Sequence, residues 1–273
     1  MDDIRGLKIL STLAEDGRLT VALAEETLPP PKGHEILVSV EAAPINPSDL
    51  GLLFGPADVE HADYGEGRIV AQMPDGARRA MAARVGQSMP VGNEGAGTVI
   101  AAGDAPEAQA LLGKLVTCVP GGMFAQYRLV DARSAMLLPD GASAEEGASA
   151  FVNPMTALGF VETMRQEGHK AIVHTAAASN RGQMLVRIAQ EDGIPLVNIV
   201  RSEAQVDLLK ALGAEHVLDS SQPDFRDQLQ AAIDATGATI AFDAIGGGPL
   251  VGQILHAMEQ AASKGAAYSR YGS

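Results

Sequence analysis

Cysteine and tryptophan are nearly absent from this sequence of 273 residues, which has one of the former and none of the latter. With a single thiol, Cys118, the chain cannot form an internal disulfide or a zinc site built from several cysteines. No apolar run approaches the roughly 18 residues that a membrane-spanning helix needs, and the N-terminus shows no basic-then-apolar signal peptide. These absences predict a soluble, cytoplasmic protein with no membrane partner.

Positive charge is also scarce. The chain has 20 Lys and Arg against 34 Asp and Glu, a formal net charge of −14, and no block of consecutive basic residues. Because nucleic acids and anionic lipids are bound by clustered positive charge, this balance argues against both as partners. A small-molecule substrate is the expected partner instead.

The second half of the chain is organised around residues 171–185. Ala171 to His174 form a short apolar run typical of a buried strand, and a turn of small residues leads into apolar positions at helical spacing. Such a turn lets backbone N–H groups and a helix N-terminus approach a pyrophosphate. The dinucleotide fingerprint has glycine at the positions of Ala176, Ser179 and Gly182, and only the last is glycine here. The turn predicts a nucleotide site or an ordinary strand-to-helix crossover.

Strands and helices alternate beyond this turn. Further strands are expected over residues 196–200, 216–218 and 239–242, separated by helices over 203–212 and from near Pro223. This alternation predicts a doubly wound parallel sheet, an α/β fold that binds ligands at the carboxyl ends of its strands. Asp243 and Gly246 close the last strand, either near the riboses of a dinucleotide or as a simple strand-to-helix turn.

Arg201 favours NADP over NAD. An acidic residue about 20 residues past the glycine turn normally accepts from the ribose 2′-hydroxyl of NAD. Arg201 stands there instead, and it can pair with a 2′-phosphate or be a solvated strand-end residue. Ser202 and Gln205 have the spacing of a capping box, so Ser202 can cap a helix, contact a phosphate, or both.

The first half of the chain has a different pattern. Two strands flank a hairpin turn at residues 15–17, and more short strands are expected over 35–41, 92–100, 115–119 and 124–130. Many short strands divided by Gly and Pro predict a compact β-barrel domain. We place this domain at residues 1–140 and the parallel-sheet domain at 141–273. Cys118 ends an apolar strand and is expected in the core.

A long segment, residues 55–90, interrupts the first domain. A stretch of this length is typical of a lid, a binding loop or a disordered insertion. It carries three arginines, Arg78, Arg79 and Arg84, which could grip a phosphate of a coenzyme A thioester or form a solvated cluster.

Six motifs occur in a recognisable order: Ile45–Asp49, Gly92–Gly97, Asn153–Ala157, Thr175–Gln183, Leu209–His216 and Phe242–Gly247. In this order the chain resembles the medium-chain dehydrogenase/reductase superfamily, and within it the zinc-independent quinone oxidoreductases and 2-enoyl thioester reductases. The resemblance implies a GroES-like barrel domain followed by a Rossmann domain, with NADP(H) in the cleft between them.

One departure from that family pattern and the absence of zinc ligands shape the expectation. Family members normally continue for roughly another third of a chain, so this one is expected to be truncated, with its Rossmann sheet incomplete. The homodimer that the resemblance implies pairs through those missing strands. Where zinc-dependent members have metal ligands, this chain has Asn46, Asn93 and Asn153, and amides are poor ligands for zinc. No metal is expected.

Without a metal, reduction of a quinone, enone or enoyl thioester is the least demanding chemistry, because the charge delocalises onto an enolate or hydroquinone oxygen. The resemblance implies that Asn46 lies near the nicotinamide ring; the alternative is a turn residue between two prolines. It also implies that Thr156 lies near the nicotinamide ribose or amide; the alternative is a residue that begins a helix. Enoyl thioester reductases use a tyrosine proton donor where this chain has Phe54. Tyr64 is the predicted substitute, with a surface tyrosine as the alternative.

The catalytic residues predicted in this way are Asn46, Tyr64 and Thr156. The predicted cofactor-binding residues are Asn46, Thr156, Ala176, Ala178, Ser179, Asn180, Arg181, Gly182, Arg201, Ser202, Asp243 and Gly246. The expected function is NADPH-dependent hydride transfer to a quinone, enone or enoyl thioester. The alternative is a non-catalytic, nucleotide-binding or scaffold member of the superfamily, like the lens crystallins that resemble quinone oxidoreductases.

Overall fold

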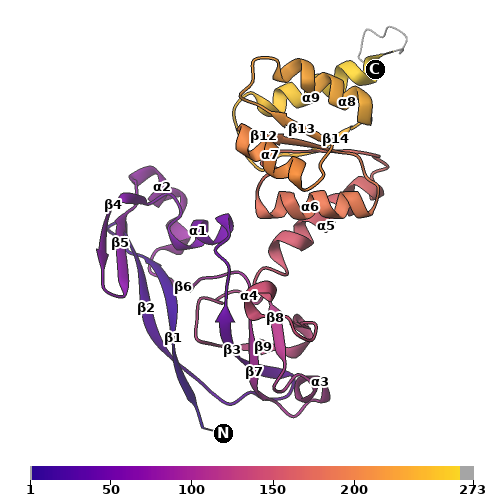
Figure 1. Ribbon diagram of the computed structural model, residues 1–273. Coiled ribbons are helices and arrows are strands. Elements are labelled where there is room, and N and C mark those ends of the chain that lie inside the picture. Colours follow the sequence, from indigo (N-terminus) through magenta and orange to yellow (C-terminus); the bar gives the residue numbers. More distant parts are fainter. Residues whose placement is uncertain (1, 265–273) are drawn as a thin grey trace. The chain divides into compact units, whose positions relative to one another are not determined.

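A computed structural model describes residues 2–264 of the chain (Figure 1). The described residues form two compact units that divide between Val152 and Asn153. We call them the first and second unit and describe each by itself. Within residues 2–264, no helix is both long and apolar enough to span a bilayer.

The first unit contains two five-stranded antiparallel sheets. One has the order β4-β5-β2-β1-β6, and its strands are β1 (Ile4–Leu13), β2 (Arg18–Leu28), β4 (Asp58–Gly65), β5 (Arg68–Gln72) and β6 (Ser88–Pro90). The other has the order β10-β8-β7-β3-β9, with β3 (Glu35–Ala42), β7 (Gly95–Ala102), β8 (Leu115–Cys118), β9 (Tyr127–Asp131) and β10 (Ala135–Leu137). The β-rich domain of short strands expected for this part is confirmed.

Short helices connect these strands: α1 (Pro47–Leu53), α2 (Asp75–Ala80), η1 (Ala82–Arg84), α3 (Pro106–Ala110), η2 (Ala132–Ser134) and α4 (Ala144–Gly147). The core of the second sheet comes from alternate residues such as Ile36, Val38 and Val116, as expected for strands with one buried face. Cys118 packs there with no exposed surface, and burial raises the pKa of its thiol to about 11. Its predicted place in the core is confirmed.

Residues 55–90 are folded, which corrects the expectation of a lid, loop or disordered insertion. Strands β4 and β5 form a hairpin that pairs with β2 and extends the first sheet, and β6 closes its other edge against β1. Met73 and Val85 from this segment pack with Leu13 and Leu19 of the first hairpin. The segment is therefore part of the first unit's framework.

The three arginines of this segment have separate structural roles rather than forming one cluster. Arg78 donates to the carbonyl of Glu15, and the guanidinium of Arg79 donates to the carbonyl of Asp75. Arg84 reaches inward, donating to Ser11 Oγ at 2.6 Å and to the carbonyl of Leu52 at 2.9 Å, and burial lowers its pKa. The three arginines therefore form neither a single solvated cluster nor a single phosphate-binding group.

The second unit is a four-stranded parallel sheet of order β13-β12-β11-β14, built from β11 (Ile172–His174), β12 (Leu196–Val200), β13 (His216–Asp219) and β14 (Ile240–Phe242). Helices α8 (Phe225–Thr236) and α9 (Leu250–Ser263) pack on one face through Leu229 and Ile254. Helices α5 (Val152–Gln166), α6 (Asn180–Glu191) and α7 (Glu203–Ala211) cover the other, as Figure 1 shows. The predicted doubly wound α/β fold is confirmed.

The order of this sheet fixes where a ligand can bind. Strand β11 pairs with β12 on one side and with β14 on the other, so the chain leaves β11 in one direction and later returns on the opposite side. At such a reversal, the loops after neighbouring strands diverge and leave a crevice at the carboxyl ends. The turn after β11 opens into that crevice.

Candidate functional site

The turn between β11 and α6 has the geometry of a dinucleotide fingerprint in spite of its substitutions. Ala176 has a φ of 50°, and it is the single non-glycine residue in residues 2–264 with a positive φ. A Cβ on Gly182 would lie 2.0 Å from the carbonyl oxygen of Ala177, so only glycine lets α6 pack this close to the turn. Ser179 caps α6 by accepting from the Gly182 N–H at 3.2 Å.

Ala176→Gly is expected to raise the free energy of unfolding by about 0.5–1 kcal/mol, because the left-handed region costs alanine roughly 1–2 kcal/mol and costs glycine nothing. Urea denaturation followed by circular dichroism measures it. Ala178→Gly, two residues on and outside that region, is the control and is expected to destabilise. Destabilisation by both substitutions would mean that Ala176 is not held in the left-handed conformation.

A cavity of about 390 Å³ lies beside this turn, at the carboxyl ends of the parallel strands. Its described lining brings together predicted residues that are far apart in the sequence and adds others: Ala176, Ala178, Ser179, Ile199, Val200, Arg201, Gln205, Ser220 and Ile245. The turn after β11, the end of β12 and Arg201 therefore line the same cavity, at the carboxyl ends of the strands where the sequence predicted a ligand site. Gln205, Ser220 and Ile245 were missed. Gln205 lies in α7, four residues after Arg201, and the pairing of β12 with β13 and of β11 with β14 brings Ser220 and Ile245 there.

Arg201 and Ser202 stand at the start of α7. The Arg201 side chain is exposed at the cavity, and its backbone N–H donates to Gln205 Oε1 at 3.1 Å. Within the described residues, Ser202 makes no side-chain capping hydrogen bond although it occupies the N-cap position. The capping box allowed by the sequence has not formed, because Gln205 bonds to Arg201 instead.

Asp243 holds the turn after β14 against the turn after β11. Its Oδ1 accepts from the Thr175 hydroxyl at 2.6 Å, and its carboxylate also accepts from the N–H groups of Ile245 and Gly246. Burial pushes the pKa of Asp243 upward, but these hydrogen bonds outweigh it and the pKa is lowered. Asp243 and Gly246 form the strand-to-helix turn, and their contact with a cofactor stays a prediction. Thr175, which ties the two turns together, was missed.

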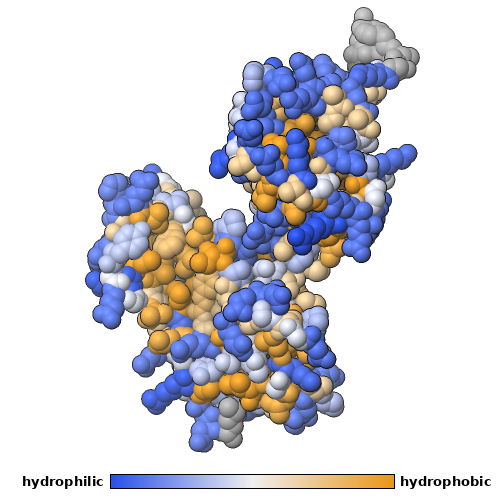
Figure 2. All heavy atoms as spheres, viewed as in Figure 1, coloured by the Kyte–Doolittle hydropathy of each residue, from blue (hydrophilic) through white to orange (hydrophobic). Residues whose placement is uncertain are grey.

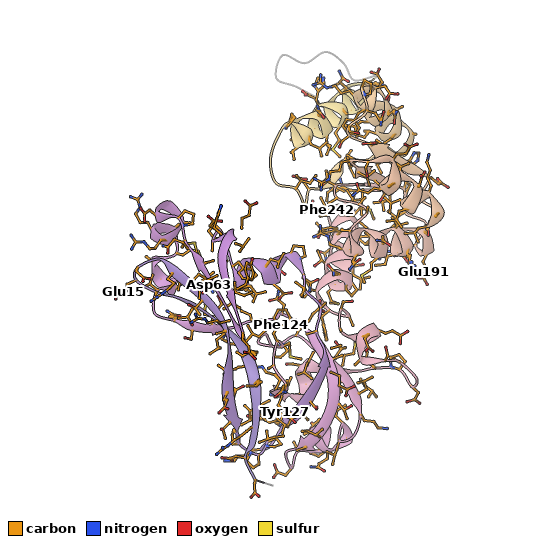
Figure 3. The ribbon with its side chains drawn as sticks, turned by 60° about the vertical axis from the view of Figure 1, so that its left-hand side comes forward. Glu15, Asp63, Phe124, Tyr127, Glu191 and Phe242 are labelled. Carbon is orange, nitrogen blue, oxygen red and sulfur yellow. The ribbon has the colours of Figure 1, made fainter. Side chains whose placement is uncertain are left out.

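Arg181 points its guanidinium at an aromatic pair. Its Cζ lies 5.4 Å from the centroid of the Phe160 ring, which stacks on Phe242 with 4.0 Å between the ring centroids. Figure 3 labels Phe242. His174, wholly buried beside them, has its pKa lowered to about 4 by burial and by the charge of Arg181. The His174 imidazole is therefore neutral at pH 7 and packs against the Phe160 ring, with 5.9 Å between the ring centroids. The predicted cofactor contacts of Asn180 and Arg181 stay predictions.

In the first unit, Asn46 is clamped by two buried carboxylates. It stands directly before α1, where its backbone N–H donates to Asp49 Oδ2 at 2.8 Å and its Nδ2 donates to Glu94 Oε1 at 2.9 Å. The other oxygen of Glu94 accepts from the N–H groups of Phe151 and Val152 at 2.8 and 2.9 Å. Glu94 and Asp49 have no exposed surface. Asn46 is therefore more than a turn residue between prolines.

Glu94 is the functional candidate that sequence reasoning missed. Its signal was present in the motif Gly92–Gly97, where it directly follows Asn93. Asn93 itself donates from Nδ2 to Ser48 Oγ at 2.9 Å and from its backbone N–H to Asp49. Across the described part of the chain, no group of three or more His, Cys, Asp or Glu side chains is arranged to hold a metal ion.

Tyr64 and Thr156 lie in regular secondary structure. Tyr64 is 65% exposed on β4, and its hydroxyl donates to the carbonyl of Val59 at 2.7 Å. Thr156 lies inside α5 rather than at its start, because the helix begins at Val152. Their predicted catalytic roles stay predictions.

Comparison with known proteins finds two matching family models. Residues 32–140 match the alcohol dehydrogenase GroES-like domain, and residues 182–264 match the zinc-binding dehydrogenase family. Mitochondrial enoyl-[acyl-carrier-protein] reductase of Bos taurus is 27% identical over 221 residues, which are 79% of this chain and 53% of the bovine protein. The chain thus spans about half the length of that curated relative.

Solved structures of related proteins share the fold of this chain. A putative NADPH:quinone reductase from Mesorhizobium loti is 30% identical, with a TM-score of 0.68 over 94% of this chain and 72% of that one. A mycobacterial protein solved in complex with NADPH shares the fold at 20% identity, with a TM-score of 0.64 over 91% and 69% of the two chains. With its GroES-like sheets and its parallel Rossmann sheet, this chain belongs to the medium-chain dehydrogenase/reductase superfamily.

Proposed function

We propose that the chain binds NADPH in the second unit and takes part in reducing a quinone, an enone or an enoyl thioester without a metal. The observation that carries the proposal is Arg201, which lines the cavity after β11 where NAD-binding sheets present an acidic residue. Relatives named as quinone reductases and enoyl reductases support the substrate class.

The residues of the cavity fit a dinucleotide phosphate. The close approach at Gly182 and the left-handed Ala176 bring the N-terminus of α6 to this turn, and a helix N-terminus suits a pyrophosphate. Arg201 offers a planar, permanently charged fork that matches a 2′-phosphate. Ser202, whose hydroxyl is not used in the helix cap, stands beside it.

When bound, NADPH supplies the hydride, and the protein supplies binding and orientation. Arg201 and the turn between β11 and α6 would hold the cofactor in one position and orientation in the cavity. In the first unit, Asn46 is held by Glu94 and Asp49, so its carboxamide has a fixed direction before any substrate arrives. We propose that this carboxamide orients the polar head of the substrate, since a preformed polar group costs no reorganisation during reaction.

Arg201→Ala is expected to weaken NADPH binding by about 10- to 100-fold, since a charge-assisted hydrogen bond contributes about 1.5–3 kcal/mol. NADH lacks the 2′-phosphate, so its binding is expected to change little. Isothermal titration calorimetry of both nucleotides against both proteins measures the two effects. Arg187→Ala is the matched control, because Arg187 is exposed on α6 and does not belong to the described cavity lining.

Equal loss of NADPH and NADH binding would assign Arg201 a structural role and leave the cofactor preference unexplained. If the folded wild-type protein binds neither nucleotide, the enzymatic proposal fails for this chain. In that case a non-catalytic scaffold role is the remaining alternative.

A further inference from the structure

The second unit has another cavity, at the amino ends of its strands, that the proposed function does not use. Its volume is about 290 Å³. The described lining comes from the end of α6, the loop into β12, β12 itself and the loop between α7 and β13. In Figure 3, Glu191 at the end of α6 and Phe242 at the end of β14 lie on opposite sides of the second unit. This cavity and the one beside Arg201 are therefore at opposite ends of the sheet.

A buried amide with an unpaired oxygen belongs to the lining. Asn198 is the middle residue of β12 and is 1% exposed, while Leu196 and Val200, two residues away on either side, pack in the hydrophobic core. Its Nδ2 donates to the carbonyls of Leu196 and His216, both at 3.3 Å. Its Oδ1 is buried and has no hydrogen-bond partner among the described residues. Because an unpaired buried acceptor is destabilising, an occupant that donates a hydrogen bond to this oxygen would stabilise the folded unit.

Two further acceptors line the same cavity. Gln190 of α6 donates from its Nε2 to the carbonyl of Leu212 at 2.9 Å, which leaves its Oε1 for an occupant. Glu215 adds an exposed carboxylate at the rim. The ring of His216 offers one donor and one acceptor when neutral, and the described lining includes no lysine or arginine. Since the N–H groups of both amides are already used, the cavity presents mainly acceptors and one negative charge.

Two helices end at this cavity. Helix α6 ends at Glu191 and α7 at Ala211, and the lining residues Gly193 and Gly213 follow two positions after those ends. The C-terminus of a helix carries a partial negative charge, which favours a cation near its last turn. Lys210 lies in the last turn of α7, but it is exposed and outside the described lining. The two helix ends and the acceptors therefore favour the same kind of occupant, a positively charged one.

The rest of the wall is apolar. Val186 and Ala189 come from α6, and Ile194 and Leu196 come from the segment that leads into β12. The surface of the second unit seen in Figure 2 is mostly hydrophilic, with smaller hydrophobic areas between the polar residues. A cavity of roughly 150 Å³ holds one benzene ring, so this larger one has room for a ring that carries a substituent. The occupant is therefore expected to have a compact apolar body.

We propose that this cavity binds a small organic cation, with an ammonium or guanidinium group on a compact apolar body. The charged group donates to Asn198 Oδ1, and Gln190 and Glu215 accept from it at the rim. Both hydrogen bonds of the Asn198 Nδ2 are long, so the amide can turn its oxygen toward the donor. The inference does not rest on the proposed function, because the described linings of the two cavities share no residue.

Calorimetry with benzylammonium, benzyl alcohol and benzoate tests the proposal, because the three compounds share a ring and differ in charge. Benzylammonium is expected to bind about tenfold or more tightly than benzyl alcohol, since hydrogen bonds to charged groups are the stronger ones, and benzoate is expected not to bind.

Variants locate the site. Asn198→Leu is expected to weaken benzylammonium binding at least about tenfold, and Glu215→Gln, which removes an exposed charge, by up to about fivefold. Glu203→Gln is the matched control, because Glu203 is also exposed but stands at the start of α7, outside the described lining. It is expected to change nothing.

The proposal is wrong if benzyl alcohol binds the folded protein as tightly as benzylammonium, or if none of the three compounds binds. Equal binding by the wild type and Asn198→Leu would also overturn it. If Asn198→Leu does not fold, the three compounds and Glu215→Gln decide. The wild type is titrated with NADPH in the presence and absence of benzylammonium, and its affinity for NADPH is expected to be the same. Competition between the two would place the cation in the nucleotide cavity and contradict the proposal.

Discussion

Gly182→Ala is expected to lower the free energy of unfolding of the second unit by about 3 kcal/mol or more and to abolish nucleotide binding. The new Cβ would lie 2.0 Å from the carbonyl oxygen of Ala177 and 2.5 Å from its carbonyl carbon. Both are backbone atoms, which cannot rotate away as a side-chain end could. Either α6 or the turn must therefore shift, and with it the N-terminus of α6 beside the cavity.

A matched substitution separates this clash from the general effect of alanine in a helix. Gly252 lies in α9, and nothing lies within 4 Å of a Cβ built on it. Gly252→Ala is expected to stabilise by about 0.5–1 kcal/mol, the difference in helix propensity between the two residues. Urea denaturation and NADPH titration of both variants give the comparison. Stabilisation by Gly182→Ala as well would show that α6 does not approach the turn this closely.

The second unit could be predicted well from its sequence. The strands of this unit are short and apolar, and the helices between them end near Gly or Pro. Strand β12, for example, was expected over the residues that form it, Leu196–Val200. Parallel strands are buried on both faces, so each gives a compact hydrophobic signal. Four of the nine described residues that line the cavity were predicted, because the fold itself sets where the turn after β11 and the end of β12 meet.

The segment 55–90 could not be predicted in the same way. Strand β4 is almost wholly exposed, so its sequence has no alternation of buried and exposed residues to reveal it. It is a strand because it pairs with β5, which pairs with β2, and that pairing spans about fifty residues. Arg84 illustrates the same limit, since its partners Ser11 and Leu52 are distant in the sequence.

The hydrogen bonds that hold Asn46 could be predicted from the sequence only in part. Asn46, Pro47 and Asp49 carry a local helix-start signal, with proline in the first turn and an acidic residue that accepts from the N–H of Asn46. Glu94 is 48 residues away from Asn46 and 57 from Phe151. No spacing rule joins such residues, so only the fold reveals that one carboxylate binds all three donors.

Glu94→Gln is expected to lower kcat by roughly 100-fold while the protein remains folded, since displacement of an orienting group has effects of this size. The three partners of the carboxylate are all donors: Nδ2 of Asn46 and the backbone N–H groups of Phe151 and Val152. Glutamine offers one acceptor oxygen and an NH₂ group, so a donor would face a donor. The conflict is relieved if the Asn46 carboxamide turns over, which exchanges its oxygen and nitrogen.

The stability of the same variants shows whether Glu94 is a positioning residue or only a structural one. Glu94→Gln is expected to cost about 1–3 kcal/mol in the free energy of unfolding, and Glu94→Ala more, because it leaves the buried donors without an acceptor. Glu41→Gln is the matched control, since the exposed carboxylate of Glu41 also accepts two donors, from Thr98. It is expected to change stability by no more than about 0.5 kcal/mol.

Steady-state kinetics with NADPH and a quinone or enone then separates the two roles. Positioning predicts that Glu94→Gln lowers kcat far more than it raises KM, while Glu41→Gln changes neither. A folded Glu94→Gln variant with unchanged kcat would contradict a role in the reaction for the hydrogen bond from Asn46 Nδ2 to Glu94. NADPH binding is expected to be the same in all three proteins, since the cavity with Arg201 belongs to the second unit. A loss confined to kcat would therefore locate the defect at the carboxamide of Asn46.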